Sequence, residues 1–119
     1  MRTREEVLAF GMTFPDVYTD APFHDDNWVL LRCKGNKKAF AWTYERNGRL
    51  CVNVKTDPAW RDFWRSAYPA VQPGYHQNKE HWNTIVLDGT IPEADVKRMI
   101  GESYDLVVGK GAKAPVRRE

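Results

Sequence analysis

The stretch that decides the fold is Trp28–Lys55, which reads WVLLRCKGNKKAFAWTYERNGRLCVNVK. It contains three apolar runs, separated by Gly35-Asn36 and Asn47-Gly48. An Asn-Gly pair between two such runs is a strong signal for a two-residue hairpin turn. We therefore predict an antiparallel meander of three strands. Its strands are expected at about residues 28–34, 37–44 and 49–55.

The register of this meander sorts its side chains onto two faces. Two-residue turns at both hairpins would pair Leu31 with Phe40, and Trp42 with Asn53. The first face, which we assign to the core because it is mostly aliphatic, carries Trp28, Leu30, Arg32, Ala39, Ala41, Thr43, Leu50, Val52 and Val54. The second face mixes aromatic with polar side chains and carries Val29, Leu31, Cys33, Phe40, Trp42, Tyr44, Cys51, Asn53 and Lys55.

Two interpretations of the second face stay open. Polar groups are costly to bury unpaired, which favours a face that is open to solvent or to a ligand. Aromatic side chains beside Asn53 and Lys55 would then resemble a platform on which bases stack. Alternatively, the segment at residues 13–26 covers the face, and its aromatic side chains form an ordinary half-buried ladder.

The segments that flank the meander predict an α+β domain. A capping box begins a helix at about residues 4–12, and Asp57-Pro58 begins a second helix that runs to about Tyr68. Residues 13–26 contain two prolines and four aspartates, so we expect an irregular connection there. The order of elements is helix, three-stranded meander, helix, strand, helix, which is typical of an α+β fold with an antiparallel sheet. The last strand and helix are expected at about residues 82–87 and 91–109.

Composition limits the class of protein. The 119 residues are 42% hydrophobic and include five Trp, which indicates one packed domain, expected over residues 1–110, before a flexible basic tail at 111–119. We expect a cytoplasmic monomer, because no apolar run could cross a membrane and the N-terminus lacks a secretory signal. A net charge of +2 and a pI of about 8.6 permit nucleic-acid binding without requiring it.

The two cysteines are not expected to form a disulfide. Cys33 and Cys51 lie on the first and third predicted strands, which are too far apart for a disulfide bond.

Residues Gly74–Thr84 form an unusually polar segment at the start of a predicted strand. Its histidines, His76 and His81, are five residues apart, which does not match the spacing of helical metal ligands. No metal site and no cofactor are therefore predicted. A nucleophile motif is also absent from the sequence, so we expect no catalytic residues and a protein that is not an enzyme. The segment is a candidate surface for a ligand.

Basic side chains gather at the two hairpin tips of the meander. They are Lys34, Lys37 and Lys38 at the first tip, and Arg46 and Arg49 at the second. Lys55 ends the third strand beside the first tip, so these lysines form the tighter cluster. Cations at these positions could contact phosphates, or they could simply keep sheet edges from associating.

The chain resembles the YjbR family, also called MmcQ/YjbR-like, over about residues 3–110. The matching residues are Pro22-Phe23, Asn53-Val54-Lys55, Asp57-Pro58, Gly74-Tyr75-His76, Asn78-Lys79, His81-Trp82-Asn83-Thr84, Leu87-Asp88-Gly89 and Ser103-Tyr104-Asp105-Leu106-Val107. The resemblance implies a fold similar to that of CyaY, the bacterial frataxin homologue, with helices on one face of an antiparallel sheet. It also implies DNA binding through a "double wing" motif, for which the two basic hairpins are candidates. Frataxin-type iron binding is not expected, because the first helix offers only Glu5 and Glu6, next to Arg2 and Arg4.

Two hypotheses about function follow. The first is a DNA-binding protein without enzymatic activity, whose contacts are Lys34, Lys37, Lys38, Arg46, Arg49, Lys55, Lys79, Trp42 and Asn53. The alternative is a module that binds a small ligand or a protein through Asn53, Lys55, His76, Asn78, Lys79, His81 and Asn83.

Overall fold

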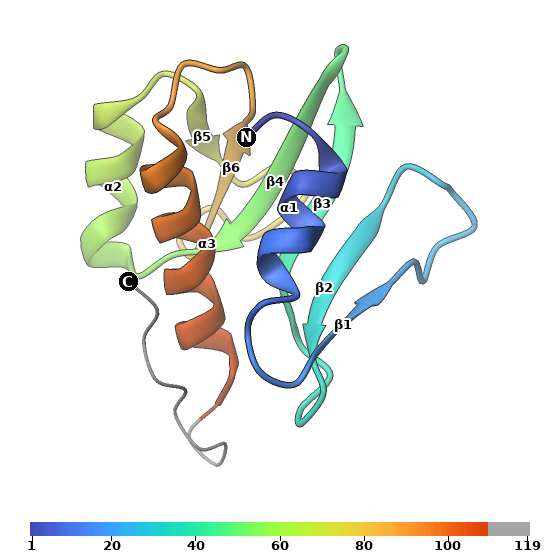
Figure 1. Ribbon diagram of the computed structural model, residues 1–119. Helices are drawn as coiled ribbons and strands as arrows, with labels where there is room; N and C mark the ends of the chain where they lie inside the picture. The colour runs from blue at the N-terminus through green and yellow to red at the C-terminus, as the bar shows by residue number, and fades with distance from the viewer. Residues whose placement is uncertain (110–119) are drawn as a thin grey trace.

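The computed structural model describes residues 1–109 as three helices and one six-stranded sheet. In chain order the elements are α1 (Arg4–Gly11), β1 (Val17–Asp20), β2 (Val29–Cys33), β3 (Ala39–Arg46), β4 (Arg49–Lys55), α2 (Pro58–Ala67), β5 (Val71–Pro73), β6 (Trp82–Val86) and α3 (Glu93–Val107). The strands are antiparallel in the order β1-β2-β3-β4-β6-β5, and the helices lie on one face of the sheet (Figure 1). The predicted α+β fold is confirmed.

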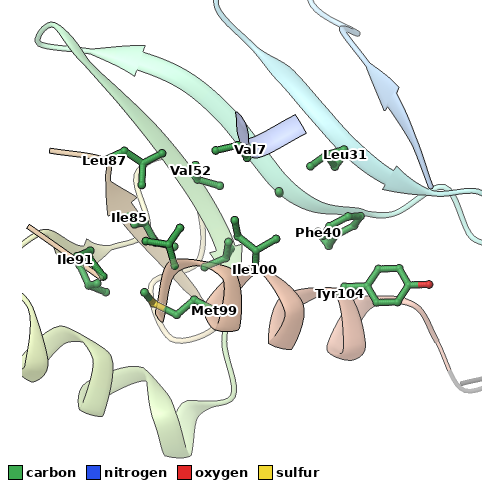
Figure 2. Close-up of a cluster of buried hydrophobic side chains, with 14 of the residues drawn as sticks. Val7, Leu31, Phe40, Val52, Ile85, Leu87, Ile91, Met99, Ile100 and Tyr104 are labelled. Carbon is green, nitrogen blue, oxygen red and sulfur yellow. The ribbon is translucent and has the colours of Figure 1, made fainter. Parts of the chain in front are cut away.

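The main core lies between the sheet and the helices. Figure 2 shows Val52 and Ile85 of the sheet facing Met99 and Ile100 of α3, and all four side chains are buried. Each such aliphatic or methionine side chain contributes roughly 1.5–3 kcal/mol by leaving water. The Ser103 hydroxyl also ties α3 to the sheet, because it donates to a carbonyl of β3 at 2.6 Å and accepts an N–H of β4 at 2.7 Å.

The first hairpin differs from the sequence prediction. Its loop spans residues 34–37, since the Cys33 N–H donates to the Lys38 carbonyl and the Lys37 N–H donates back to the Cys33 carbonyl. Leu31 pairs with Ala41 rather than with Phe40, and the register shifts after Leu31. The predicted two-residue turn at Gly35-Asn36 is therefore wrong. The second hairpin has the predicted register, with Arg46 opposite Arg49 and Trp42 opposite Asn53.

This shift changes the assignment of several side chains to faces. Leu31, Cys33 and Phe40 belong to the core under the helices, although the predicted register placed them on the other face. Trp28 stacks on Tyr44 with ring centroids 4.2 Å apart, so it lies on the face away from the helices. The assignment of Ala41, Leu50, Val52 and Val54 to the core is confirmed.

The described residues also test the predictions about segment 13–26, the two cysteines and membrane-spanning helices. The segment 13–26 is not wholly irregular, because it contains the edge strand β1, and β5 is a second edge strand that the sequence did not indicate. Cys33 and Cys51 are both free thiols. Within residues 1–109, no helix has the length and apolar character needed to cross a bilayer. The predicted tail at 111–119 lies outside the described residues.

Candidate ligand pocket on the open face of the sheet

The sheet face opposite the helices, here called the open face, carries a layer of aromatic side chains. Trp28 stacks on Tyr44, and Tyr44 stacks on Tyr75 with centroids 5.6 Å apart. Phe23 stacks on Trp42 with centroids 6.3 Å apart. The segment before β2 therefore covers part of this face, as one of the two open interpretations proposed.

A pocket of about 400 Å³ remains between this segment and the loop that follows β5. Its walls are mainly apolar and aromatic, and a few polar side chains reach it. The lining residues are Phe23, Asp25, Trp28, Trp42, Asn53, Tyr75, His76 and Gln77. Trp42, Asn53 and Thr84 are direct neighbours across β3, β4 and β6, so the strand register fixes the floor of the pocket.

Asn53 is the centre of a buried hydrogen-bond network beneath the pocket. Its Oδ1 accepts from the Tyr44 hydroxyl at 2.7 Å and from the Thr84 hydroxyl at 2.6 Å. Its Nδ2 donates to the Tyr75 carbonyl at 2.8 Å, and the Tyr75 N–H donates to the Thr84 hydroxyl at 2.9 Å. Networks with satisfied partners specify one arrangement of a buried polar cluster. The position of Tyr75 is therefore set by the sheet itself.

Two backbone features bring the Tyr75 loop to the pocket. A Cβ atom at Gly74 would lie 2.7 Å from the Cβ of Trp82, so only glycine allows the loop to approach β6 this closely. His76 has φ of 60°, in the left-handed region that non-glycine residues rarely occupy. Its ring lies against that of Tyr75, with centroids 4.1 Å apart. Backbone strain of this kind persists at sites where the surrounding structure holds it in place.

The buried ionisable groups near this face are neutral at physiological pH. Burial raises the pKa of the Tyr44 hydroxyl to about 12 and raises the pKa of the Cys51 thiol. On the helix side, burial raises the pKa of the Cys33 thiol to about 11. Because the thiolate is the nucleophilic form of cysteine, neither thiol is activated. Among residues 1–109, no three His, Cys, Asp or Glu side chains come together as a metal site.

The residues of the predicted ligand cluster do not gather in one place. Asn53 and His76 line the pocket, whereas the Asn83 side chain lies toward α2 and accepts from Arg65 Nε at 2.7 Å. The Asn78 side chain accepts the Glu80 N–H and so shapes the loop. The remaining members are Lys55, which lines a separate pocket, and Lys79 and His81, which are exposed.

The predicted DNA contacts are also divided. Lys38 and Lys55 lie together, since both line a second pocket of about 300 Å³ that also includes Trp42. At the other tip, the Arg46 guanidinium lies over the Tyr75 ring, 4.0 Å from its centroid. The other predicted basic contacts are exposed side chains: Lys34, Lys37, Arg49 and Lys79.

Several pocket residues were absent from the predicted site. Phe23 and Tyr75 occur in motifs that carry the family resemblance, so their positions could have been included. Trp28 was missed because the wrong register placed it under the helices. Gln77 lies within the polar segment Gly74–Thr84, so its position could also have been included, whereas Asp25 has no local signal.

Comparisons with known proteins agree with the motifs. A sequence model of the YjbR family matches residues 12–106. The uncharacterized protein YjbR of Escherichia coli strain K12 is 31% identical over 106 residues, which are 89% of this chain and 87% of the relative. YyaQ of Bacillus subtilis is 30% identical over 117 residues, covering 89% of this chain and 98% of that protein.

The fold is also similar to solved structures. The crystal structure of Deinococcus radiodurans protein DR2400, whose domain is described as DUF419, has a TM-score of 0.85 and 31% sequence identity. The similarity covers 95% of this chain and 83% of that one. A protein from Pseudomonas syringae has a TM-score of 0.78 at 24% identity, covering 88% of this chain and 98% of its own. The family match and the relatives together show that this chain belongs to the YjbR family.

Proposed function

We propose that this protein is a non-enzymatic binding module that takes a small, largely apolar ligand into the open-face pocket. The observation that carries the proposal is the pocket itself, with about 400 Å³ of space, aromatic walls and a hydrogen-bonded floor at Asn53. Ligand sites in proteins are concave, mostly apolar and provided with a few fixed polar groups. The pocket has each of these properties.

The distribution of charge supports a small ligand over a phosphate backbone. Four of the 18 basic residues and one of the 16 acidic residues follow Gly109, so residues 1–109 carry 14 basic and 15 acidic side chains. Affinity for DNA comes largely from an excess of Lys and Arg facing phosphates. Residues 1–109 have no such excess.

The test is binding followed by the fluorescence of Trp28 and Trp42, which both line the pocket. A panel of small metabolites is titrated into the wild type, and hits are compared between Phe23→Ala and Phe63→Ala. These two phenylalanines are similarly exposed, at 47% and 52%, but Phe63 lies on α2, away from the pocket. We expect Phe23→Ala to weaken binding about tenfold, the loss of roughly 1.4 kcal/mol of contact. Equal effects of both changes, or no hit in the panel, would contradict the proposal.

DNA binding is the second candidate, and the cluster of Lys38 and Lys55 in one pocket favours it. Its contacts would be the basic side chains at both hairpin tips together with Lys79. We expect fluorescence anisotropy with a duplex and a single strand to show binding that weakens at least tenfold between roughly 50 and 200 mM salt. Lys38→Ala should weaken it further, while Lys97→Ala on α3 serves as the control. The absence of binding at low salt would exclude this candidate.

We also propose that the protein is a cytoplasmic monomer. Two buried free thiols fit a reducing compartment, where disulfides are rare. Light scattering coupled to size-exclusion chromatography tests the oligomeric state, and cell fractionation tests the location. A dimer, or recovery outside the cytoplasm, would contradict this part of the proposal.

A further inference from the structure

The charge around the open-face pocket points to the class of ligand. Among the described residues that line it, Asp25 is the only acidic one, and none is Lys or Arg. The backbone N–H of Asn27 donates to the Asp25 carboxylate at 2.7 Å, which holds this group at the rim. Gln77 adds a side-chain oxygen that is buried and has no hydrogen-bond partner. The indole N–H of Trp42 is likewise buried without a partner, so the charge of the Asp25 carboxylate, and not the balance of polar atoms, is what favours a positive ligand.

The aromatic walls favour a positive ligand for a separate reason. Trp28 stands nearly perpendicular to Trp42 and to Phe23, with interplanar angles of 86° and 83° and centroids 6.4 and 6.3 Å apart. The face of an aromatic ring is the negative part of its quadrupole, so ring walls that meet at right angles can surround a cation. The chain already places one cation on this layer, because the Arg46 guanidinium lies over Tyr75 without lining the pocket.

We propose that the pocket binds the methylated ammonium group of a small molecule. This inference rests on the proposed function and names the chemistry of its ligand. A primary ammonium ion is strongly hydrated and needs several acceptors, which these mostly apolar walls do not supply. A methylated ammonium spreads its charge over carbon and packs against aromatic faces, the arrangement found in aromatic cages. Asp25 then balances the charge at the rim.

The experiment compares choline with its neutral tert-butyl analogue, in which a carbon replaces the charged nitrogen. Both compounds have the same shape, so their difference reports the charge. We expect choline to quench or shift the Trp fluorescence and to bind at least tenfold more tightly than the analogue. Equal binding of the two compounds, or no binding of choline, would overturn the inference. A peptide with trimethyl-lysine forms a second arm, and clearly tighter binding of the peptide would overturn the assignment to a small molecule.

Asp25→Asn and Asp26→Asn form the matched pair of variants. Both positions are exposed, but only Asp25 lines the pocket. We expect Asp25→Asn to weaken choline about threefold to tenfold and to leave the neutral analogue unchanged, because exposed charge pairs contribute roughly 0.2–1 kcal/mol and partly enclosed ones more. Equal effects of the two variants would contradict the role of Asp25. If Phe23→Ala weakens a neutral hit while choline does not bind, the inference fails and the proposed function stands. If no compound binds, both fail.

Discussion

The two faces of the sheet bury side chains by different means. The helix face is closed by aliphatic side chains such as Val52 and Ile100, which are fully buried in a continuous core (Figure 2). Within residues 1–109, all three helices lie on the other face and none covers the open face. It buries Tyr44 and Asn53 just as completely, but under aromatic rings and within a hydrogen-bond network.

The difference between the faces explains why this pocket lies on the open face. Helices that pack against a sheet fill the volume between them to the density of an organic crystal. Rings contributed by two loops cover the open face less evenly, and a pocket of about 400 Å³ remains there. The left-handed backbone of His76 lies at the same place. The helix face thus holds the closed core, and the open face holds the pocket that we propose as the ligand site.

The largest expected effect is on the helix face. Ile100→Ala should lower the free energy of unfolding by about 4 kcal/mol, because it removes buried atoms and leaves a cavity in a closed core. Leu106→Ala, on the exposed side of the same helix, should cost less than about 1 kcal/mol. Urea denaturation measures both. Similar losses of unfolding free energy in the two variants would mean that α3 does not close the core on the helix face.

On the open face, Asn53→Leu should cost about 3 kcal/mol, since it removes the oxygen that accepts from the Tyr44 and Thr84 hydroxyls and the N–H that donates to the Tyr75 carbonyl. Thr43→Val is the control for the helix face, because Thr43 is buried but makes one hydrogen bond, to the Val29 carbonyl. We expect this control to cost about 1 kcal/mol. The same urea titrations apply. A smaller loss for Asn53→Leu than for Thr43→Val would show that the network does not hold the open face.

The sequence predicts the second hairpin well and the first one poorly. Asn47-Gly48 adopts positive φ at both residues, as a type I′ turn requires, and this turn fixes the register of β3 and β4. Gly35-Asn36 looks similar, but the Asn36 side chain donates to the Val107 carbonyl at the end of α3. Its role is therefore set by a contact 71 residues away, which no local pattern contains.

The site is predictable only in part for the same reason. Trp42 and Asn53 follow from the register of one hairpin, and Tyr75 and His76 follow from the polar segment. Gln77 belongs to the same polar segment, and the rest of the pocket comes from the loop before β2, which has no periodicity. The alternation of a strand says which residues share a face. It does not say which loop crosses that face. The sequence therefore predicts the residues on the floor of the candidate site but not those that form its walls.

Alkaline pH should test both faces at once. The raised pKa values mean that the folded protein keeps the protons of Tyr44 and Cys33 where the unfolded chain releases them. Their contribution to stability is therefore complete below the ordinary pKa values, 9.0 for Cys33 and 10.0 for Tyr44, and is lost as the pH rises toward about 11 and about 12. We expect these two groups together to lower the stability by at most about 3–4 kcal/mol by about pH 11.

Two variants show how much of this loss of stability at alkaline pH comes from each face. Tyr44→Phe should flatten the pH dependence between about pH 10 and 11, and Cys33→Ala should flatten it from about pH 9. Urea titrations across this range give the slopes. An unchanged slope in Tyr44→Phe would mean that the hydroxyl of the open face is not buried as deeply as the helix-side thiol.

The smallest expected effect is that of exchanging alanine and glycine, which has opposite signs at position 76 on the open face and at position 9 in α1. At His76, with φ of 60°, glycine should be more stable than alanine by about 1 kcal/mol, because a Cβ atom is disfavoured in the left-handed region. At Ala9, on the exposed side of α1, replacement by glycine should instead cost about 0.5–1 kcal/mol. Thermal and urea unfolding of His76→Gly, His76→Ala and Ala9→Gly measure these differences. If glycine is no better than alanine at position 76, the rim of the pocket is not strained. If His76→Gly is more stable than His76→Ala but binds ligand more weakly, the left-handed backbone at position 76 is needed for binding. The open face would then be less stable than it could be because its pocket requires this conformation.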